Sequence, residues 1–216
     1  MSKFKDKILN SAIPGYLNKF QITLINEIVI DTLDSGKSIS MECSRSTGGC
    51  CVGIAYASYL LDETENGYIV VYTNNDKDGL VYRNLLFRYM KFNNLKDERY
   101  VKDRLVLNPE KEWIEEHDSE IIFVVCDGIC SDKPIIIPSN VLVYGHSINT
   151  GGINKILRRN KVSFKQFKIN YEQAGYSDLW AYHMLLKLDM DWQAFRNEIL
   201  LDHSGSEEPV EKFLGM

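Results

Sequence analysis

Hydrophobic residues along this chain follow two different spacings. Some form short unbroken runs, which are typical of strands covered on both faces, and others recur every three or four positions, which indicates amphipathic helices. The unbroken runs predict strands at residues 38–43, 67–73, 120–126 and 140–146. Residues 162–170 alternate between apolar and polar side chains, which predicts a further strand at the edge of a sheet.

Segments with helical spacing fill most of the intervals between these runs. The predicted helices span residues 17–36, 50–62, 76–92, 151–160, 177–188 and 191–202. Ser177 and Asp191 open the last two and are suitable N-caps, because their side chains can accept hydrogen bonds from the first helical turn. Residues 94–109 follow neither spacing clearly, and residues 134–137 suit either a strand or an extended segment.

Strands that alternate with helices predict an α/β domain whose central sheet is mainly parallel. We expect this domain to span residues 1–203 and to be followed by a polar, flexible tail at 204–216. In such a sheet, ligands bind at the carboxyl ends of the strands. The side chains of helix 76–92 that we expect to face the core are Leu80, Leu85, Leu86 and either Tyr89 or Met90.

Composition narrows the class of protein only a little. The 216 residues are 44% hydrophobic and 25% charged, as in an ordinary globular protein. No apolar run reaches the roughly 18–20 residues that span a bilayer, and the N-terminus lacks the features of a secretion signal. The net charge of −5 gives the chain as a whole no electrostatic attraction to nucleic acid. We therefore expect an intracellular protein that has no membrane partner.

The cysteines do not form a recognisable metal-binding pattern. Their spacing lacks the paired knuckles of zinc sites, so we expect free thiols and no metal site. His146 is the histidine nearest to the predicted strand ends, and we expect it to be structural. The five cysteines are Cys43, Cys50, Cys51, Cys126 and Cys130.

The segment that follows the first predicted strand carries the main candidate chemistry. A strand, a glycine turn and a helix start are the setting in which backbone N–H groups bind phosphate. A phosphate loop also needs a lysine and a Ser or Thr hydroxyl, where this chain has Gly49 and Cys50. On these residues alone, a phosphate site and a structural turn are both open. The candidate nucleotide-binding residues of this loop are Ser44, Arg45, Ser46, Thr47, Gly48, Gly49 and Cys50.

The order of features along residues 16–202 resembles the ATPase domain of phage terminase large subunits, the DNA-packaging motors of tailed phages. The resemblance begins with the aromatic–Gln pair Phe20-Gln21 and continues with the loop described above. The strand that corresponds to Walker B ends in Asp127-Gly128 in place of Asp-Glu. Ser147 and Asn149 occupy the place of the coupling motif, and "FRNE" at 195–198 is similar to a helix near the end of that domain.

This resemblance implies a three-layer P-loop NTPase-like fold with a mainly parallel sheet flanked by helices. It implies that Gln21 lies near adenine and that the loop 44–50 holds phosphates. It further implies that Arg45 acts near the γ-phosphate and that Asp127 reaches Mg²⁺ through water. The residues also allow a plainer interpretation, in which Arg45 is solvated or pairs with backbone and Asp127 is a turn former before Gly128.

The departures from the family pattern predict a loss of catalysis. Gly49 removes the lysine charge, Cys50 is a soft ligand where Mg²⁺ prefers oxygen, and Gly128 removes the carboxylate that would orient water. We therefore expect no confident catalytic residue and only weak binding of ATP and Mg²⁺. The alternative is an active ATP-hydrolysing packaging subunit with altered motifs. The terminase nuclease domain is not expected, since the chain stops at Met216.

A basic segment suggests a second surface. Phe164 and Phe167 are interleaved with its cations, which is compatible with a nucleic-acid or partner surface. A solvated helix and strand would give the same pattern. The cations are Lys155, Arg158, Arg159, Lys161, Lys165 and Lys168.

Together these features predict a phage-encoded, catalytically inactive, terminase-ATPase-like protein that acts as a binding or regulatory module in the host cytoplasm. Its expected partner is a protein of the packaging machinery or of the host, and DNA is a further candidate.

Overall fold

The computed structural model describes residues 30–216, apart from residues 65, 93–97, 130–134 and 207. Of the helix expected at 17–36, the described part is α3 (Ile30–Leu33), which is followed by a turn. Gly36 adopts a φ of 74° in this turn. Gln21 and Cys130 lie outside the described residues.

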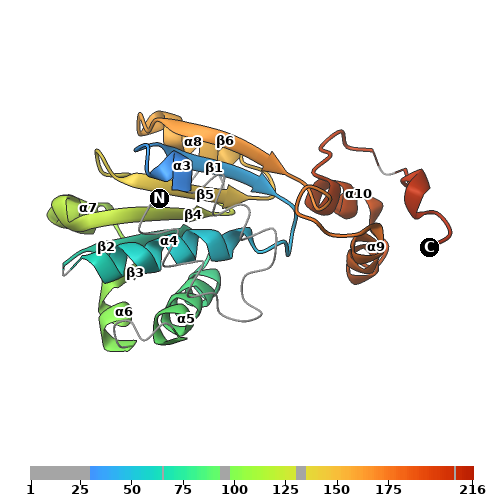
Figure 1. Cartoon of the computed structure of the whole chain (residues 1–216). Coiled ribbons are helices and arrows are strands. Elements are labelled where there is room, and N and C mark those ends of the chain that lie inside the picture. Colours follow the sequence, from blue (N-terminus) through green and yellow to red (C-terminus); the bar gives the residue numbers. More distant parts are fainter. Residues whose placement is uncertain (1–29, 65, 93–97, 130–134, 207) are drawn as a thin grey trace.

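The described strands form one six-stranded sheet in which every pairing is parallel. The strand order is β3-β2-β4-β5-β1-β6 (Figure 1). The four strands predicted from unbroken apolar runs are confirmed and lie side by side, and the alternating segment is confirmed as an edge strand. The strand bounds are Ser38–Cys43 (β1), Tyr68–Thr73 (β2), Leu105–Leu107 (β3), Ile121–Asp127 (β4), Leu142–Ser147 (β5) and Phe164–Ile169 (β6).

Helices cover both faces of the sheet, which makes three layers (Figure 1). One apolar cluster joins α3, α4 and α5 to one face, and a second joins α7 and α8 to the other. The predicted α/β architecture is confirmed. The main helices are α4 (Gly49–Glu63), α5 (Asp76–Phe92), α6 (Glu98–Arg104), α7 (Lys111–His117) and α8 (Gly151–Arg159).

Two sequence expectations need correction. Leu80 does not face the core, since it is 47% exposed. The buried face of α5 consists of Tyr82, Leu86 and Met90, and Leu80 lies beside that face. Residues 98–107, which showed no clear pattern, form α6 and β3. A three-residue strand is too short to show a period, so its pairing with β2 becomes visible only in the sheet. Residues 135–137 are extended outside any strand.

A small C-terminal lobe, residues 171–216, lies beyond the carboxyl ends of the strands (Figure 1). It comprises α9 (Asp178–Lys187), α10 (Trp192–Phe195) and a π-helical turn at Arg196–Leu200. Ser177 and Asp191 cap α9 and α10 as expected, by accepting hydrogen bonds from the backbone N–H groups of Trp180 and Ala194. The lobe has its own apolar cluster, in which Phe213 of the segment 204–216 packs edge-on against Phe195.

Helix α4 packs closely on the sheet because small residues line it. Nine of its fifteen residues are buried, among them Gly53, Ala55 and Ala57. A Cβ atom at Gly53 would lie 2.5 Å from the ring of Tyr144, which is fully buried on β5. The close approach of α4 to the sheet therefore requires glycine at this position. None of the described helices has the length and hydropathy needed to cross a bilayer.

We predict that Gly53→Ala destabilises the protein by about 1–3 kcal/mol through overpacking, although alanine normally favours a helix. The control is Gly79→Ala on α5, whose added Cβ would meet only the movable side-chain tips of Leu107 at 3.0 Å. It should stay within about 1 kcal/mol of the parent protein. Urea unfolding followed by circular dichroism measures both. Equal effects of the two substitutions would contradict this account of the α4 interface.

Candidate functional site

The candidate site lies where the carboxyl ends of β1, β4 and β5 meet the N-terminus of α4. These strands are neighbours, with β5 between β4 and β1. His146 on β5 is in register with Asp127 on β4 and with Met41 on β1. The loop Ser44–Gly48 joins β1 to α4 above this edge. The sequence therefore placed the candidate loop at the correct edge of the sheet.

The backbone of this loop has the shape of an anion-binding turn. Ser46 and Gly48 both adopt left-handed conformations, with φ of 63° and 85°, on either side of Thr47. Gly48 is also the N-cap residue of α4. Left-handed residues are common in anion-binding turns, and the dipole of α4 adds positive potential at its N-terminus. Two N–H groups of the loop are used inside the protein, however: that of Arg45 donates to the carbonyl oxygen of Glu198, and that of Thr47 donates to the carbonyl oxygen of Ser44.

Its hydroxyl groups, however, bond to the protein itself. The buried Ser44 hydroxyl donates a hydrogen bond to the carbonyl oxygen of Ile199 at 2.5 Å. The buried Thr47 hydroxyl donates one to the carbonyl oxygen of Ser44 at 2.7 Å. Both side chains therefore hold the loop in place. These contacts give no support to the nucleotide-binding role predicted for Ser44 and Thr47.

Arg45 is held by the C-terminal lobe. Its backbone N–H donates to the carbonyl oxygen of Glu198 at 2.7 Å, and its guanidinium pairs with the carboxylate of Glu198 at 2.5 Å. The Arg45 side chain is 52% exposed, so the ion pair itself contributes little stability. The contact matters more for position, since it directs the arginine toward the lobe.

His146 fills the space beside Gly49, the position at which the sequence interpretation expected a phosphate loop to carry lysine. A Cβ atom built on Gly49 would lie 2.6 Å from the imidazole of His146 and 2.6 Å from the sulfur of Cys43. The hydroxyl of the buried Tyr144 donates a hydrogen bond to the carbonyl oxygen of Gly49 at 2.7 Å. Glycine at position 49 is therefore a consequence of packing, because any larger side chain would displace the imidazole.

His146 connects two side chains that come from the neighbouring strands. Its Nδ1 lies 3.1 Å from Oδ1 of Asp127, and its Nε2 lies 2.9 Å from Sγ of Cys43. Burial lowers the pKa of His146, but its interactions with Cys43 and Asp127 outweigh burial and raise this pKa to about 10. The imidazole is therefore a cation at neutral pH, with the Asp127 carboxylate as its charged partner.

Asp127 is committed to the same contact. Burial raises its pKa, but the hydrogen bond and the charge of His146 outweigh burial and hold the pKa below its usual value. The hydroxyl of Tyr82 is buried beside this carboxylate, and it has no hydrogen bond of good geometry within the described residues. The Walker B-like aspartate thus remains ionised, with an imidazolium as its partner.

Cys50 is a poor metal ligand in this setting. A hydrogen bond with Cys51, followed by burial, raises the pKa of the Cys50 thiol well above its ordinary value. A neutral thiol does not replace the hydroxyl oxygen that Mg²⁺ prefers. Within the described part of the chain, no three His, Cys, Asp or Glu side chains are grouped so that they could hold a metal ion.

The other predicted site residues are placed as follows. Ser147 and Asn149 shape the turn before α8: the Ser147 hydroxyl accepts from the Asn149 N–H, and the Asn149 side chain accepts from the Gly151 N–H. Lys168 pairs with the buried Glu42 at 2.9 Å and donates to the carbonyl oxygen of Leu201, so it belongs to the lobe contact. The remaining predicted cations, Lys155, Arg158, Arg159, Lys161 and Lys165, are exposed on α8, on β6 and in the turn between them.

The sequence interpretation missed the roles of Cys43 and His146 in this site. Both residues end predicted strands, and that position is the signal that could have identified them. The distance between them depends on the strand order, because 103 residues separate them along the chain.

Comparison with known proteins shows the fold and no closer relationship. No protein-family model matches the sequence, and no curated protein matches it. A solved structure, described as that of a hypothetical ATP-dependent RNA helicase from Sulfolobus tokodaii, superposes with a TM-score of 0.50 at 12% identity. The match covers 78% of this chain and 57% of that one. The chain therefore has a P-loop NTPase-like α/β fold.

The protonated imidazole predicts a pH-dependent contribution to stability. We expect His146→Gln to destabilise the protein by about 1–3 kcal/mol below pH 6.5, because it leaves the Asp127 carboxylate without its cationic partner. The folded-state pKa is raised to about 10. The advantage of the parent protein is therefore fully present below about pH 6.5, the pKa of an unfolded-state histidine, as long as Asp127 is ionised. It is lost as pH rises from there to about 10, the folded-state pKa.

Urea unfolding of both proteins at intervals between pH 5 and pH 10 measures this difference. The control is His183→Gln, since His183 is exposed on α9. It should match the parent at every pH. A difference for His146→Gln that is constant or grows with pH would contradict a cationic imidazole.

Proposed function

We propose that this protein is a phage-encoded, terminase-ATPase-like module that does not hydrolyse ATP and acts by binding and regulating a protein partner. One observation carries the catalytic half of the proposal: the imidazole of His146 fills the space of the lysine side chain and pairs with Asp127. Both charges that a P-loop NTPase uses around the β- and γ-phosphates are thereby absent or neutralised.

The lost charge is costly for phosphoryl transfer, which depends on positioning and charge neutralisation. A preorganised charged donor of this kind contributes about 10²–10³ to rate. His146 does not replace it, because its positive charge is balanced by the adjacent Asp127 carboxylate. Moreover, Gly128 follows Asp127 with a φ of 61°, which a glutamate adopts only with strain. The backbone at this strand end is therefore unsuited to the second Walker B carboxylate.

Anion binding by the loop backbone does not depend on these side chains. The left-handed residues of the loop and the N-terminus of α4 would still attract a phosphate group. We therefore expect nucleotide to bind weakly and with little dependence on Mg²⁺. Such binding suits a regulatory module. The C-terminal lobe contacts the loop through Arg45 and Glu198, so a nucleotide bound at the loop would alter the position of the lobe.

The terminase relationship rests on the order of sequence features, and the partner it suggests is a protein of the packaging machinery or of the host. The P-loop NTPase-like fold supports this proposal only in general terms. Capture from phage-infected cells with tagged protein would test the partner. Enrichment of packaging or host proteins that is lost when Arg45→Glu disrupts the lobe contact would support the regulatory role.

Steady-state hydrolysis tests the catalytic half. We expect no turnover above background, against about 1–100 s⁻¹ for typical kinases. Turnover above about 0.1 s⁻¹ that Asp127→Ala abolishes would refute the proposal, on the scale of those same phosphoryl-transfer rates.

Restoring the lost groups provides a sharper prediction. Gly49→Lys with Cys50→Thr should gain little affinity for Mg-ATP while His146 occupies the lysine position. Adding His146→Ala should tighten binding about tenfold or more, because it opens that space and releases Asp127 toward the metal. Calorimetry measures both variants, and His146→Ala alone is the control. Equal affinity of the double and triple variants, with both folded, would show that the imidazole does not block the site.

A further inference from the structure

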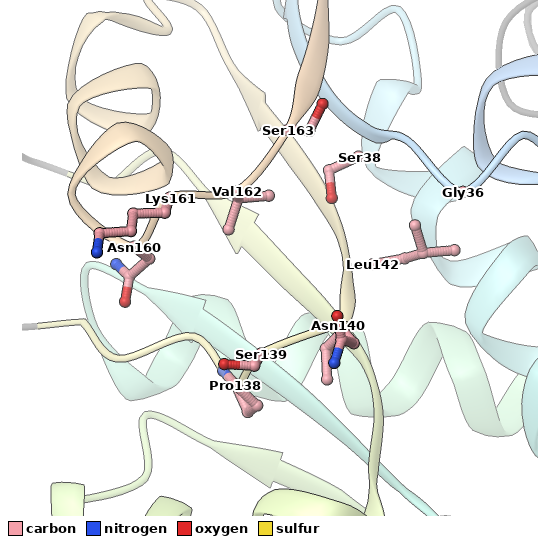
Figure 2. A pocket seen from close by; sticks show the side chains of 11 residues that line it. Gly36, Ser38, Pro138, Ser139, Asn140, Leu142, Asn160, Lys161, Val162 and Ser163 are labelled. Atoms are coloured by element: carbon pink, nitrogen blue, oxygen red, sulfur yellow. The ribbon is translucent and has the colours of Figure 1, made fainter.

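A cavity lies at the edge of the sheet opposite the candidate site, where β1, β5 and β6 begin (Figure 2). Its volume is about 670 Å³, which is in the range of ligand-binding pockets. Three segments form it: the turn before β1, the segment before β5, and the turn between α8 and β6. A strand of six residues separates this edge from the phosphate loop by about 20 Å, so the cavity is independent of the site described above.

Apolar and polar side chains both line this cavity. Leu142, Val162 and Pro138 supply apolar surface, and serine, asparagine and lysine side chains lie among them (Figure 2). The hydroxyl of Ser38 is buried and accepts a hydrogen bond from the backbone N–H of Val143. A flat ring with polar edges, such as a nucleobase, matches this combination of side chains. The exposed polar residues of the lining are Ser139, Asn140, Lys161 and Ser163.

Positive charge is concentrated around the same cavity. Residues 135–171 include six lysines and arginines and no aspartate or glutamate, in a chain whose net charge is −5. Lys168 pairs with Glu42, as described above. All six cations are exposed, and Lys161 lines the cavity itself. Phosphate groups that approach this surface therefore meet no competing carboxylate from the segment.

The C-terminal dipole of α8 explains only part of this charge. Arg158 and Arg159 lie in its last turn, where cations are favourable in any helix. Lys155 lies a turn earlier, and Lys161 and Lys165 lie beyond the helix, so the dipole does not account for them. Lys161 lines the cavity, and the other cations lie on α8 and β6, the two elements that its turn connects.

We infer that the cavity and the five cations other than Lys168 form a binding site for single-stranded nucleic acid. One base would enter the cavity, and the adjoining phosphates would lie along α8 and the start of β6. A concave pocket beside a cationic surface favours an unpaired strand, whose bases are free to turn inward, over a duplex.

Fluorescence anisotropy with labelled twelve-nucleotide single strands of DNA and RNA, and with the matching duplex, tests this site at 50 and 200 mM salt. The parent protein should bind the single strands more tightly than the duplex. Its log affinity should fall with log salt by about 0.7 for each phosphate contact. The variant Lys155→Glu/Arg158→Glu should bind at least tenfold more weakly and with a shallower slope.

A matched control separates local charge from net charge. Lys102→Glu/Lys187→Glu changes the net charge equally, at exposed positions on α6 and α9, and should alter affinity less than twofold. Ser139→Trp fills the cavity without changing charge, and it should remove the preference for single strands while leaving duplex binding unchanged.

Three results would overturn the inference: no binding by the parent protein at 50 mM salt, equal weakening by the two charge-reversed pairs, or a single-strand preference that survives Ser139→Trp. Competition by anionic lipid vesicles as effective as that by unlabelled single strands would also overturn it, in favour of a general polyanion surface. Circular dichroism of each variant confirms that it is folded.

Discussion

The contact of His146 with Asp127 and Cys43 is the constraint on which the candidate site depends. A buried cation is stable only when acidic or hydrogen-bonding partners surround it, and here the partners come from the strands on either side of β5. The imidazole therefore requires these three strands to be adjacent and in register. It also requires glycine at position 49, since α4 begins directly against it.

The same edge of the sheet shows how the loop is held. Ser46 and Gly48 adopt left-handed conformations in the connection between β1 and α4. The side chains that would act on a nucleotide have acquired internal partners: Glu198 for Arg45, Ile199 for Ser44 and His146 for Asp127.

The C-terminal lobe is part of this arrangement. Its residues 198–203 contact the loop and the end of β1, where the buried Glu42 is paired with Lys168 and lies 3.3 Å from His203. The Lys168 side chain on β6 is 55% exposed, so this ion pair by itself contributes little stability. Lys168 also donates a hydrogen bond to the carbonyl oxygen of Leu201 in the lobe. Together with the contact of His203 with Glu42, this bond holds the lobe to the sheet at the edge where the loop lies.

The sequence by itself determined the layered α/β architecture, because unbroken apolar runs, helical spacing and the caps Ser177 and Asp191 are local signals. It also predicted that a loop at 44–50 joins a strand to a helix and that a strand ends at Asp127. It did not place Leu80 correctly, because the spacing of apolar residues does not fix which residues at the border of a helix face are buried. It did not reveal β3, because three residues are too few to show the apolar spacing of a strand. Only the tertiary structure decided what surrounds the loop. The order of the strands brings Cys43 into contact with His146, although 103 residues separate the two along the chain. The packing of α4 against these two residues makes glycine necessary at position 49. Contacts of that range depend on which strands are neighbours, and the hydrophobic pattern of a single chain does not encode that order.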